Sequence, residues 1–189
     1  MPRPAETFLV KSGKEAYYLP SNEANCFVLT SELEPSNLSP SGRVEFDRVA
    51  GREMLLVGDK ALMEAGLRKA KGYGDRLLPF PKETRLEVAY KLVQRDLAYD
   101  PDAKRLVDNG GDPFSISDAL KSGINASRTG NAVCGGYASY LTLILAYAGV
   151  DAKYVTGTVE LPTASFGHAW VESGGTHYDP TFDDGEATP

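Results

Sequence analysis

The sequence contains few of the residues that cross-link a chain or anchor it in a membrane. Its 189 residues include two cysteines, Cys26 and Cys134, which gives no reason to expect a disulfide framework and suits a reducing compartment. The longest apolar stretch, near Leu143 to Val150, is far shorter than the roughly 18 residues of a membrane span. The first six residues include prolines and an acidic residue, where a signal peptide needs a basic start and an apolar run. We therefore expect a cytoplasmic protein without a membrane segment.

Basic residues are scarce in the last third of the chain. Residues 1–133 carry 19 basic and 19 acidic side chains, whereas residues 134–189 carry 1 and 7, with Lys153 as the only Lys or Arg after Arg128. No segment combines clustered basic residues with aromatics, so we expect no nucleic-acid partner. The acidic last third would attract an amine-bearing or basic substrate, although ordinary surface acidity explains the same numbers.

Length and composition indicate one compact soluble domain, or one domain with an extension. Hydrophobic residues make up 42% and charged residues 24% of the chain, as in ordinary globular proteins. Residues 1–80 contain short apolar runs separated by Gly, Pro, Ser and Asn, which predict short strands, followed by one helix. That helix should run from Asp59 to about Lys71, where Gly72-Tyr73-Gly74 ends it.

The second part of the chain has a clearer pattern. From Lys82, apolar residues recur every three or four positions and predict an amphipathic helix. Asp100 to Phe114 is polar and contains glycines and prolines, so it predicts mostly loop, and Ser115 to Lys121 predicts a short helix. We therefore divide the chain into an N-terminal extension, residues 1–80, which can pack on the core, and a core of residues 81–189.

Cys134 opens a predicted helix whose broad apolar face extends to Ala148, and Gly149 supplies the stop. At the first turn, unpaired N–H groups and the positive end of the helix dipole favour a thiolate and can bind an oxyanion. Gly135 and Gly136 weaken the helix but leave room for a substrate backbone. A buried, inert thiol is the simpler interpretation of a lone cysteine, so the assignment depends on the rest of the sequence.

A β-hairpin is predicted 34 residues further along, with Gly174-Gly175 as its turn. Strand pairing would then join positions whose numbers sum to 349, so Trp170 faces Asp179 and His168 faces Thr181. His168 and Asp179 become diagonal neighbours on one face, with Cα atoms about 7–8 Å apart. The Asp179 carboxylate can reach the His168 imidazole in this register, and a shift of one residue would separate them.

A cysteine at a helix start, a histidine on a strand and an acid beside it are the parts of nucleophilic catalysis. In this arrangement Cys134 attacks a carbonyl carbon, His168 moves the proton, and Asp179 fixes the imidazole tautomer. Acidic surroundings would raise the pKa of the thiol while stabilising a protonated imidazole. We expect the helix terminus and the imidazolium to outweigh the acids and keep the sulfur ionised.

These motifs resemble those of the transglutaminase-like superfamily of papain-like cysteine enzymes. Val133–Ala138 is similar to its nucleophile motif, Ala148–Gly157 to the segment leading into its central sheet, Gly167–Glu172 to its histidine motif and Tyr178–Thr181 to its aspartate motif. Order and spacing agree over roughly residues 82–184. The resemblance is to the microbial, cysteine-protease branch, because the animal cross-linking enzymes carry a tryptophan just after the cysteine and have flanking β domains.

The resemblance implies an α+β fold in which the cysteine helix packs against an antiparallel sheet. It implies that Cys134, His168 and Asp179 are nucleophile, base and orienting acid. We expect no cofactor and no metal, since Asp100, Asp102, Asp108 and Asp112 lack the spacing of a calcium loop.

Three functions remain open. The leading hypothesis is a cysteine hydrolase, a protease or amidase that cleaves peptide or amide bonds through a thioester in a peptide or protein substrate. An acyl transferase to amines, of the transglutaminase or deamidase type, is the second. A peptide-binding module without turnover is the third.

Weaker candidates surround the proposed triad. The oxyanion hole should combine the Cys134 N–H with a second donor, and Asn131 or Tyr99 are candidates, although Asn131 is also a typical turn residue. Trp170, Tyr137 and Gly135 are further candidates for substrate binding, and the two aromatics suit a core equally well.

Alternative members of the triad have weaker geometry. His177 is a second candidate base, but it lies at the end of the hairpin. Asp183 and Asp184 are alternatives to Asp179, yet the proline after Asp179 favours an extended backbone there. Cys26 lies in a strand-like apolar run and is interpreted as a packed thiol of low reactivity.

Overall fold

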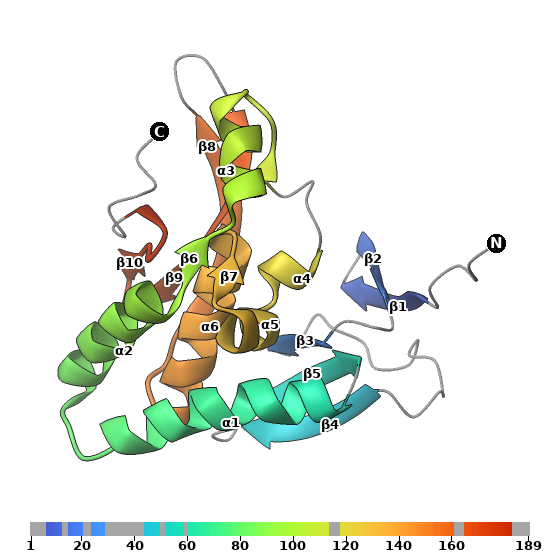
Figure 1. Cartoon of the computed structure of the whole chain (residues 1–189). Helices are drawn as coiled ribbons and strands as arrows, with labels where there is room; N and C mark the ends of the chain where they lie inside the picture. Colours follow the sequence, from blue (N-terminus) through green and yellow to red (C-terminus); the bar gives the residue numbers. More distant parts are fainter. Residues whose placement is uncertain are drawn as a thin grey trace.

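The structure is a computed structural model of the whole chain (Figure 1). It describes the backbone of residues 7–12, 15–20, 24–28, 44–49, 52–58, 60–113, 118–160 and 165–182, and the side chains of residues 64–113, 120–160 and 165–182. The helices are α1 (Lys60–Leu77), α2 (Lys82–Asp96), α3 (Pro101–Asp108), α4 (Asp118–Lys121), α5 (Gly123–Thr129) and α6 (Cys134–Tyr147). The strands are β1 (Thr7–Ser12), β2 (Glu15–Pro20), β3 (Ala24–Val28), β4 (Val44–Val49), β5 (Arg52–Gly58), β6 (Ala98–Tyr99), β7 (Asn131–Ala132), β8 (Lys153–Glu160), β9 (Ser165–Ser173) and β10 (Thr176–Tyr178). No helix in these ranges is long and apolar enough to cross a membrane.

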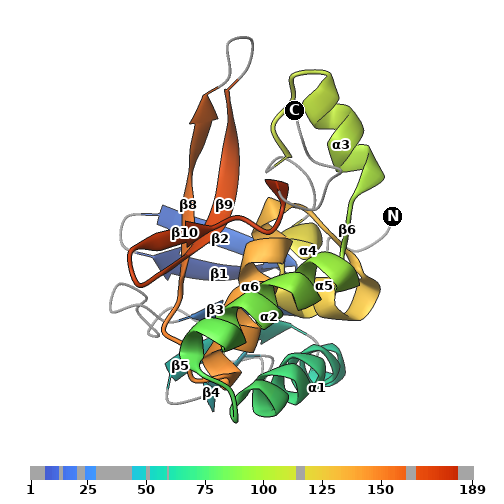
Figure 2. The same ribbon diagram turned by 90° about the vertical axis from the view of Figure 1, so that its left-hand side faces the viewer.

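Helix α6 is the centre of an α+β fold. Twelve of its 14 residues are buried, as expected for a helix that is apolar on nearly all sides. Helices α1, α2 and α5 pack around it, and β9 covers another side (Figures 1 and 2). The predicted start at Cys134 and stop before Gly149, which has a φ of +67°, are confirmed. The cysteine helix therefore packs against an antiparallel sheet, as the resemblance implied.

The sheet next to α6 has the strand order β10-β9-β8, with both pairs antiparallel. Pairing of β10 with β9 joins Thr176 to Ser173, His177 to Glu172 and Tyr178 to Val171, so the predicted register is confirmed. Gly174 and Gly175 have φ angles of +60° and +79°, as a tight hairpin turn with two left-handed residues requires. The β8–β9 hairpin extends beyond α1, α2, α5 and α6 to the level of α3 in both ribbon views (Figures 1 and 2).

Backbone hydrogen bonds hold the segment that leads into α6. The parallel pair β6–β7 brings the end of α2 beside Asn131 and Ala132. The Asp100 N–H donates to the Ala132 carbonyl at 2.9 Å, and the Val133 N–H donates to the Leu120 carbonyl at 3.1 Å. The start of α6 is thus fixed from two sides before the chain reaches Cys134.

Helix α1 is longer than predicted, because Gly72 and Gly74 do not end it. A Cβ on Gly74 would lie 2.3 Å from the Cβ of Tyr147, so this glycine lets α1 approach the end of α6 closely. Gly66 has the same function against α5, since its Cβ would lie 2.6 Å from Cγ2 of Ile124. Glycine permits this close helix packing, whereas the local sequence pattern alone predicts the end of a helix at the same residues.

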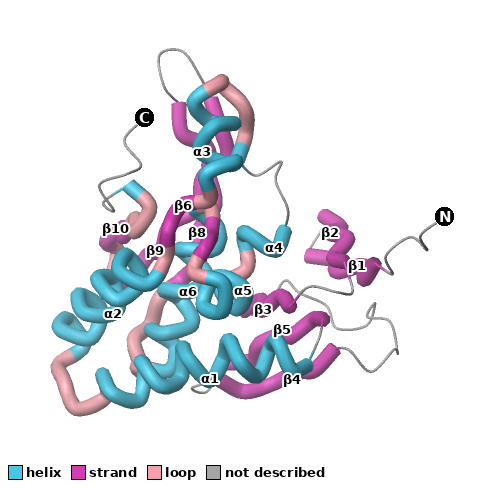
Figure 3. The backbone as a smooth tube through the Cα atoms, viewed as in Figure 1, coloured by secondary structure: helices cyan, strands magenta, loops and turns pink. Residues whose placement is uncertain are grey.

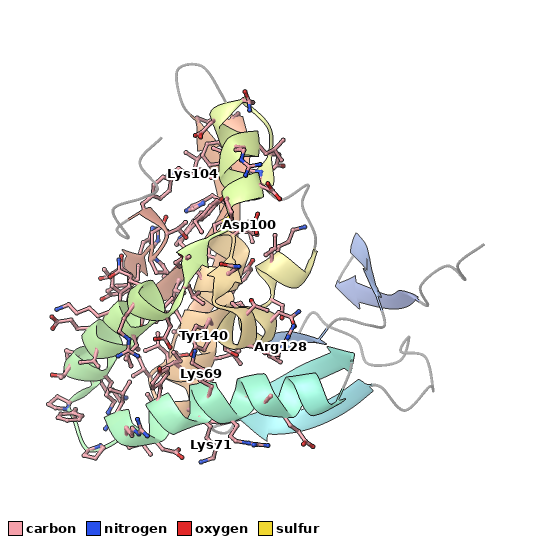
Figure 4. The ribbon with its side chains drawn as sticks, viewed as in Figure 1. Lys69, Lys71, Asp100, Lys104, Arg128 and Tyr140 are labelled. Carbon is pink, nitrogen blue, oxygen red and sulfur yellow. The ribbon has the colours of Figure 1, made fainter. Side chains whose placement is uncertain are left out.

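A charged group links four helices on this side of the core. Lys69 Nζ donates to the Ser127 carbonyl at 3.1 Å and lies 3.1 Å from Oδ2 of Asp96. The same ammonium lies 5.8 Å from the ring centre of Tyr140, and Figure 4 labels both residues where α1 meets α6. Residues from α1, α2, α5 and α6 therefore meet at one point, which favours a fixed arrangement of these helices.

The prediction of mostly loop between Asp100 and Phe114 was wrong for α3. Pro101 occupies the first turn, where its missing N–H is not needed, and so starts the helix rather than breaking it. Asp100 caps this turn by accepting hydrogen bonds from the N–H groups of Asp102 and Ala103 at 3.1 and 3.0 Å. Ala103 is completely buried, which anchors the helix.

The strands predicted in the first eighty residues are present as two sheets (Figure 3). Strands β1 and β2 form a hairpin, and β3, β5 and β4 form an antiparallel sheet in that order. Strand β3 contacts α1 and α5. Leu67, Ala70 and Leu77 of α1 belong to the same hydrophobic core as α6, so this part of the chain helps to bury α6. The division of the chain at residue 80 stays a prediction.

Candidate active site

His168 and Asp179 are joined by a hydrogen bond between Nε2 and Oδ2 at 2.5 Å. His168 lies in β9, and Asp179 directly follows β10. The confirmed register places the two residues diagonally on one face. Because Nε2 is bound to the carboxylate, Nδ1 is the imidazole nitrogen available for another proton. This contact fixes the orientation of the ring and leaves one nitrogen for other partners.

The Asp179 carboxylate is held by its own turn. Its Oδ1 accepts a hydrogen bond from the Thr181 N–H at 3.1 Å, the arrangement of an Asx turn. Its backbone carbonyl accepts a hydrogen bond from the Tyr90 hydroxyl of α2 at 2.8 Å. Both carboxylate oxygens and the backbone of Asp179 thus have fixed partners.

Two aromatic rings enclose the imidazole. Trp170 stacks on His168 with a centroid distance of 6.2 Å and an interplanar angle of 23°, and Phe182 lies 4.7 Å away on a tilted plane. Gly157 of β8 makes room for the indole, because a Cβ there would lie 2.6 Å from Cη2 of Trp170. His168 is only 4% exposed as a result. These rings restrict the imidazole to the orientation that faces Asp179.

The Cys134 sulfur lies next to the strand that carries the imidazole. The backbone N–H groups of Gly135 and of Ala169, the residue after His168, act on the sulfur and lower the pKa of its thiol. The residue is 1% exposed and its thiol is free. His168 and Asp179 are thus joined by a direct hydrogen bond, and the helix that begins at Cys134 packs against the strand that carries His168.

Burial raises the pKa of Cys134 to about 12, from an ordinary value of 9.0. The Ala169 and Gly135 N–H groups act in the opposite direction, and the charges of Asp179 and Asp112 raise the pKa further. The expectation that the helix terminus and the imidazolium keep the sulfur ionised was therefore wrong for the resting protein. The physical reason is the removal of the sulfur from water. This burial destabilises the thiolate more than the two backbone N–H groups stabilise it.

Alkylation of Cys134 should consequently be slow at neutral pH in the folded protein. We expect its rate with iodoacetamide to rise with pH beyond 10, because the thiolate fraction grows tenfold for each pH unit below the raised pKa. Peptide mapping by mass spectrometry measures the rate, and the urea-unfolded protein, with thiols of about pKa 8.5, is the control. Rapid labelling with a midpoint below pH 7 would contradict this assignment.

The first turn of α6 has close neighbours beside the sulfur. A Cβ on Gly135 would lie 3.2 Å from the Tyr154 hydroxyl and 3.1 Å from Cβ of Lys121, so Gly135 borders side chains of β8 and α4. A Cβ on Gly136 would lie 2.4 Å from the Leu120 carbonyl. Gly136 thus serves packing against α4, and Gly135 avoids tighter contacts with Lys121 and Tyr154 beside Cys134.

The weaker candidates occupy different environments. Asn131 is exposed in β7, and its backbone N–H and carbonyl interact with the Thr129 hydroxyl, in keeping with a turn. Tyr137 is completely buried and packs 6.4 Å from Tyr99, so its ring belongs to the core. Trp170 is partly exposed and contacts the imidazole, so it is the aromatic candidate that borders the site.

The second candidate base, His177, packs with its ring 5.9 Å from that of Trp170 rather than beside Asp179. His177 is 65% exposed, with Nε2 3.9 Å from Oε2 of Glu172, at the end of the hairpin. Asp183 and Asp184 lie outside the described residues, as does the side chain of Cys26. In the described part of the chain, no group of three or more His, Cys, Asp and Glu side chains could hold a metal ion.

Sequence reasoning missed the residues that support the triad. Tyr90, Thr181, Phe182 and the backbone of Ala169 were assigned no role, yet each contacts one of the three proposed residues. A tyrosine on the apolar face of α2 was one available signal, because a buried hydroxyl needs a partner. The identity of that partner required the three-dimensional structure.

Comparisons with known proteins agree with this geometry. The family model of the Transglutaminase-like superfamily matches residues 82–179, more than half of the chain, and the protein belongs to this superfamily. Its members include cysteine-dependent acyl transferases and proteases. None of the curated proteins matches the sequence.

Among solved structures, the chain is similar to one described as the crystal structure of a TGase. The TM-score is 0.52 at 12% sequence identity, and the match covers 77% of this chain and 46% of that one. At this identity the likeness concerns the fold, and the chain spans about half the length of that solved protein. The papain-like α+β core is thereby shown.

Proposed function

We propose that the protein is a cysteine hydrolase that cleaves peptide or amide bonds through a thioester on Cys134. One observation carries the proposal: His168 is hydrogen-bonded to Asp179, on the strand that packs against the helix beginning at Cys134. A nucleophile, a base and an acid that orients the base are thus adjacent.

Acylation begins from a protonated thiol, because burial holds the pKa of Cys134 well above neutral pH. The Cys134 proton moves to Nδ1 of His168 as the sulfur attacks the substrate carbonyl carbon. The oxyanion binds at the first turn of α6, where Val133 provides no side-chain cap and the Cys134 N–H is a donor. The imidazolium then protonates the leaving nitrogen, the C–N bond breaks, and a thioester remains.

Deacylation reverses the proton movements. Water attacks the thioester carbonyl and gives one proton to Nδ1 of His168. The C–S bond breaks, the acid is released, and the imidazole returns its proton to the sulfur. Asp179 remains ionised throughout and stabilises the imidazolium in both steps.

Acyl transfer to an amine is the second candidate. The charges of Asp179 and Asp112 act on the sulfur and would also attract an ammonium group. A primary amine would then replace water as the nucleophile that attacks the thioester. A peptide or protein with an amine-bearing or basic group is the substrate class that fits this field.

Trapping the acyl group on Cys134 tests the proposal. Wild type and Cys134→Ala would be incubated with glutamine-containing peptides and peptide anilides, with and without a fluorescent primary amine, and analysed by intact-mass and peptide mass spectrometry. We expect a covalent adduct on the Cys134 peptide, release of free acid, and no turnover in the variant.

The amine separates the two candidates. Incorporation of amine faster than acid release would contradict the hydrolase assignment and favour the transferase. Undiminished turnover in Cys134→Ala would contradict both, and peptide binding without any adduct would favour a non-catalytic module.

A further inference from the structure

Tyr90 connects helix α2 to the acid of the proposed triad. Its hydroxyl donates to the Asp179 carbonyl at 2.8 Å across 89 residues of sequence. Its ring packs edge-on against Tyr178, with centroids 6.4 Å apart and an interplanar angle of 66°. One helical side chain thus contacts both the last residue of β10 and the residue that follows it.

Asp179 needs such a contact because the strand ladder ends before it. Tyr178 is the last β10 residue paired with β9, so Asp179 lies beyond the paired part of the hairpin. The Asx turn to Thr181 orients the carboxylate relative to its own backbone, but it does not fix that backbone in the protein. The Tyr90 hydroxyl attaches this backbone to α2, outside the hairpin.

We propose that Tyr90 is a positioning residue that holds the Asp179 backbone so that its carboxylate stays aligned with Nε2 of His168. The proposal rests on the proposed function, since alignment matters only if His168 acts as a base. The Tyr90 hydroxyl donates to the backbone of Asp179 rather than to its carboxylate. Its effect on catalysis passes through Asp179.

The alternative is that Tyr90 only satisfies a partly buried hydroxyl and stabilises the fold. Tyr73 offers a matched control, because its hydroxyl makes a partly buried hydrogen bond of 2.7 Å to Oδ2 of Asp96, on the α1 side of the core. Removing the Tyr73 hydroxyl should lower stability at least as much as removing that of Tyr90, because it donates to a charged group and also accepts a hydrogen bond from Arg95 at 2.9 Å. Removal of the Tyr90 hydroxyl should in addition slow the chemical step.

The test compares Tyr90→Phe and Tyr73→Phe, each alone and combined with Asp179→Ala. Tyr90→Phe should lower kcat about 3- to 10-fold with little change in KM, whereas Tyr73→Phe should leave both unchanged. In the Asp179→Ala background, Tyr90→Phe should have no further effect on kcat, because the carboxylate that it positions is gone. A separate, substrate-free readout is the low-field NMR signal of the imidazole proton shared with the carboxylate, which Tyr90→Phe should weaken or shift and Tyr73→Phe should not.

The outcomes distinguish the two proposals. An unchanged kcat and an unchanged imidazole signal in Tyr90→Phe would overturn the role of Tyr90 while leaving a Cys134-dependent enzyme intact. An equal loss of kcat with and without the Asp179 carboxylate would also overturn it, because a purely structural effect behaves in that way. Activity that survives Cys134→Ala would instead overturn the proposed function, and the NMR signal would still report on Tyr90.

Discussion

Replacement of His168 by alanine is expected to lower the rate of amide cleavage by about 10²- to 10⁴-fold. The loss should be large because the Cys134 pKa of about 12 leaves the thiol protonated, so that the attack on the carbonyl requires a base. The loss should be smaller for an activated ester, whose leaving group needs no proton from the imidazolium. Steady-state kinetics on a matched amide and ester pair measure the difference.

The second histidine of the sequence provides the control. His177 is 65% exposed and lies on the same hairpin, so His177→Ala should change the rate less than about twofold. Equal losses in the two variants would indicate damage to the hairpin. A fully active His168→Ala protein would contradict the assignment of the base.

Replacement of Gly74 by alanine is expected to destabilise the fold by about 2–3 kcal/mol. A Cβ at this position would lie 2.3 Å from the Cβ of Tyr147 and 2.8 Å from its carbonyl carbon, so α1 must move away from α6. Urea unfolding followed by circular dichroism gives the free energy of unfolding.

The neighbouring glycine makes the comparison sharp. Gly72 lies in the same helix with nothing within 4 Å of its Cβ position, so Gly72→Ala should stabilise the protein by about 0.5–1 kcal/mol. Opposite signs for two glycines in one helix would show that close packing, rather than helix propensity, decides the first effect. Stabilisation by both substitutions would mean that α1 does not pack on α6 as described.

The local parts of the site could be predicted from the sequence. The register of the His168–Asp179 hairpin follows from side-chain alternation and a Gly-Gly turn, both of which are properties of adjacent residues. The start of the cysteine helix follows from its apolar run and its terminal glycine. These features depend on short stretches of chain, and the structure confirms them.

The remaining features depend on contacts between distant segments. The pKa of Cys134 is set by how completely the surrounding elements exclude water from the sulfur, and no local pattern reports that. Tyr90 and Asp179 are 89 residues apart, and the end of α1 depends on the space beside Tyr147. In each case the property of the residue is set by a distant segment of the chain that packs against it.

The two halves of the proposed triad differ in how far apart their members lie along the chain. His168 and Asp179 are separated by 11 residues within one hairpin. Cys134 lies much earlier in the chain, in helix α6, which precedes strand β8. A short loop closes faster and at lower entropic cost than a long one, so the base and its acid should meet first during folding. We expect the refolding protein to form the contact between the imidazole and the carboxylate before α6 packs against the sheet. The Cys134 sulfur would then reach the other two groups only when the core has formed.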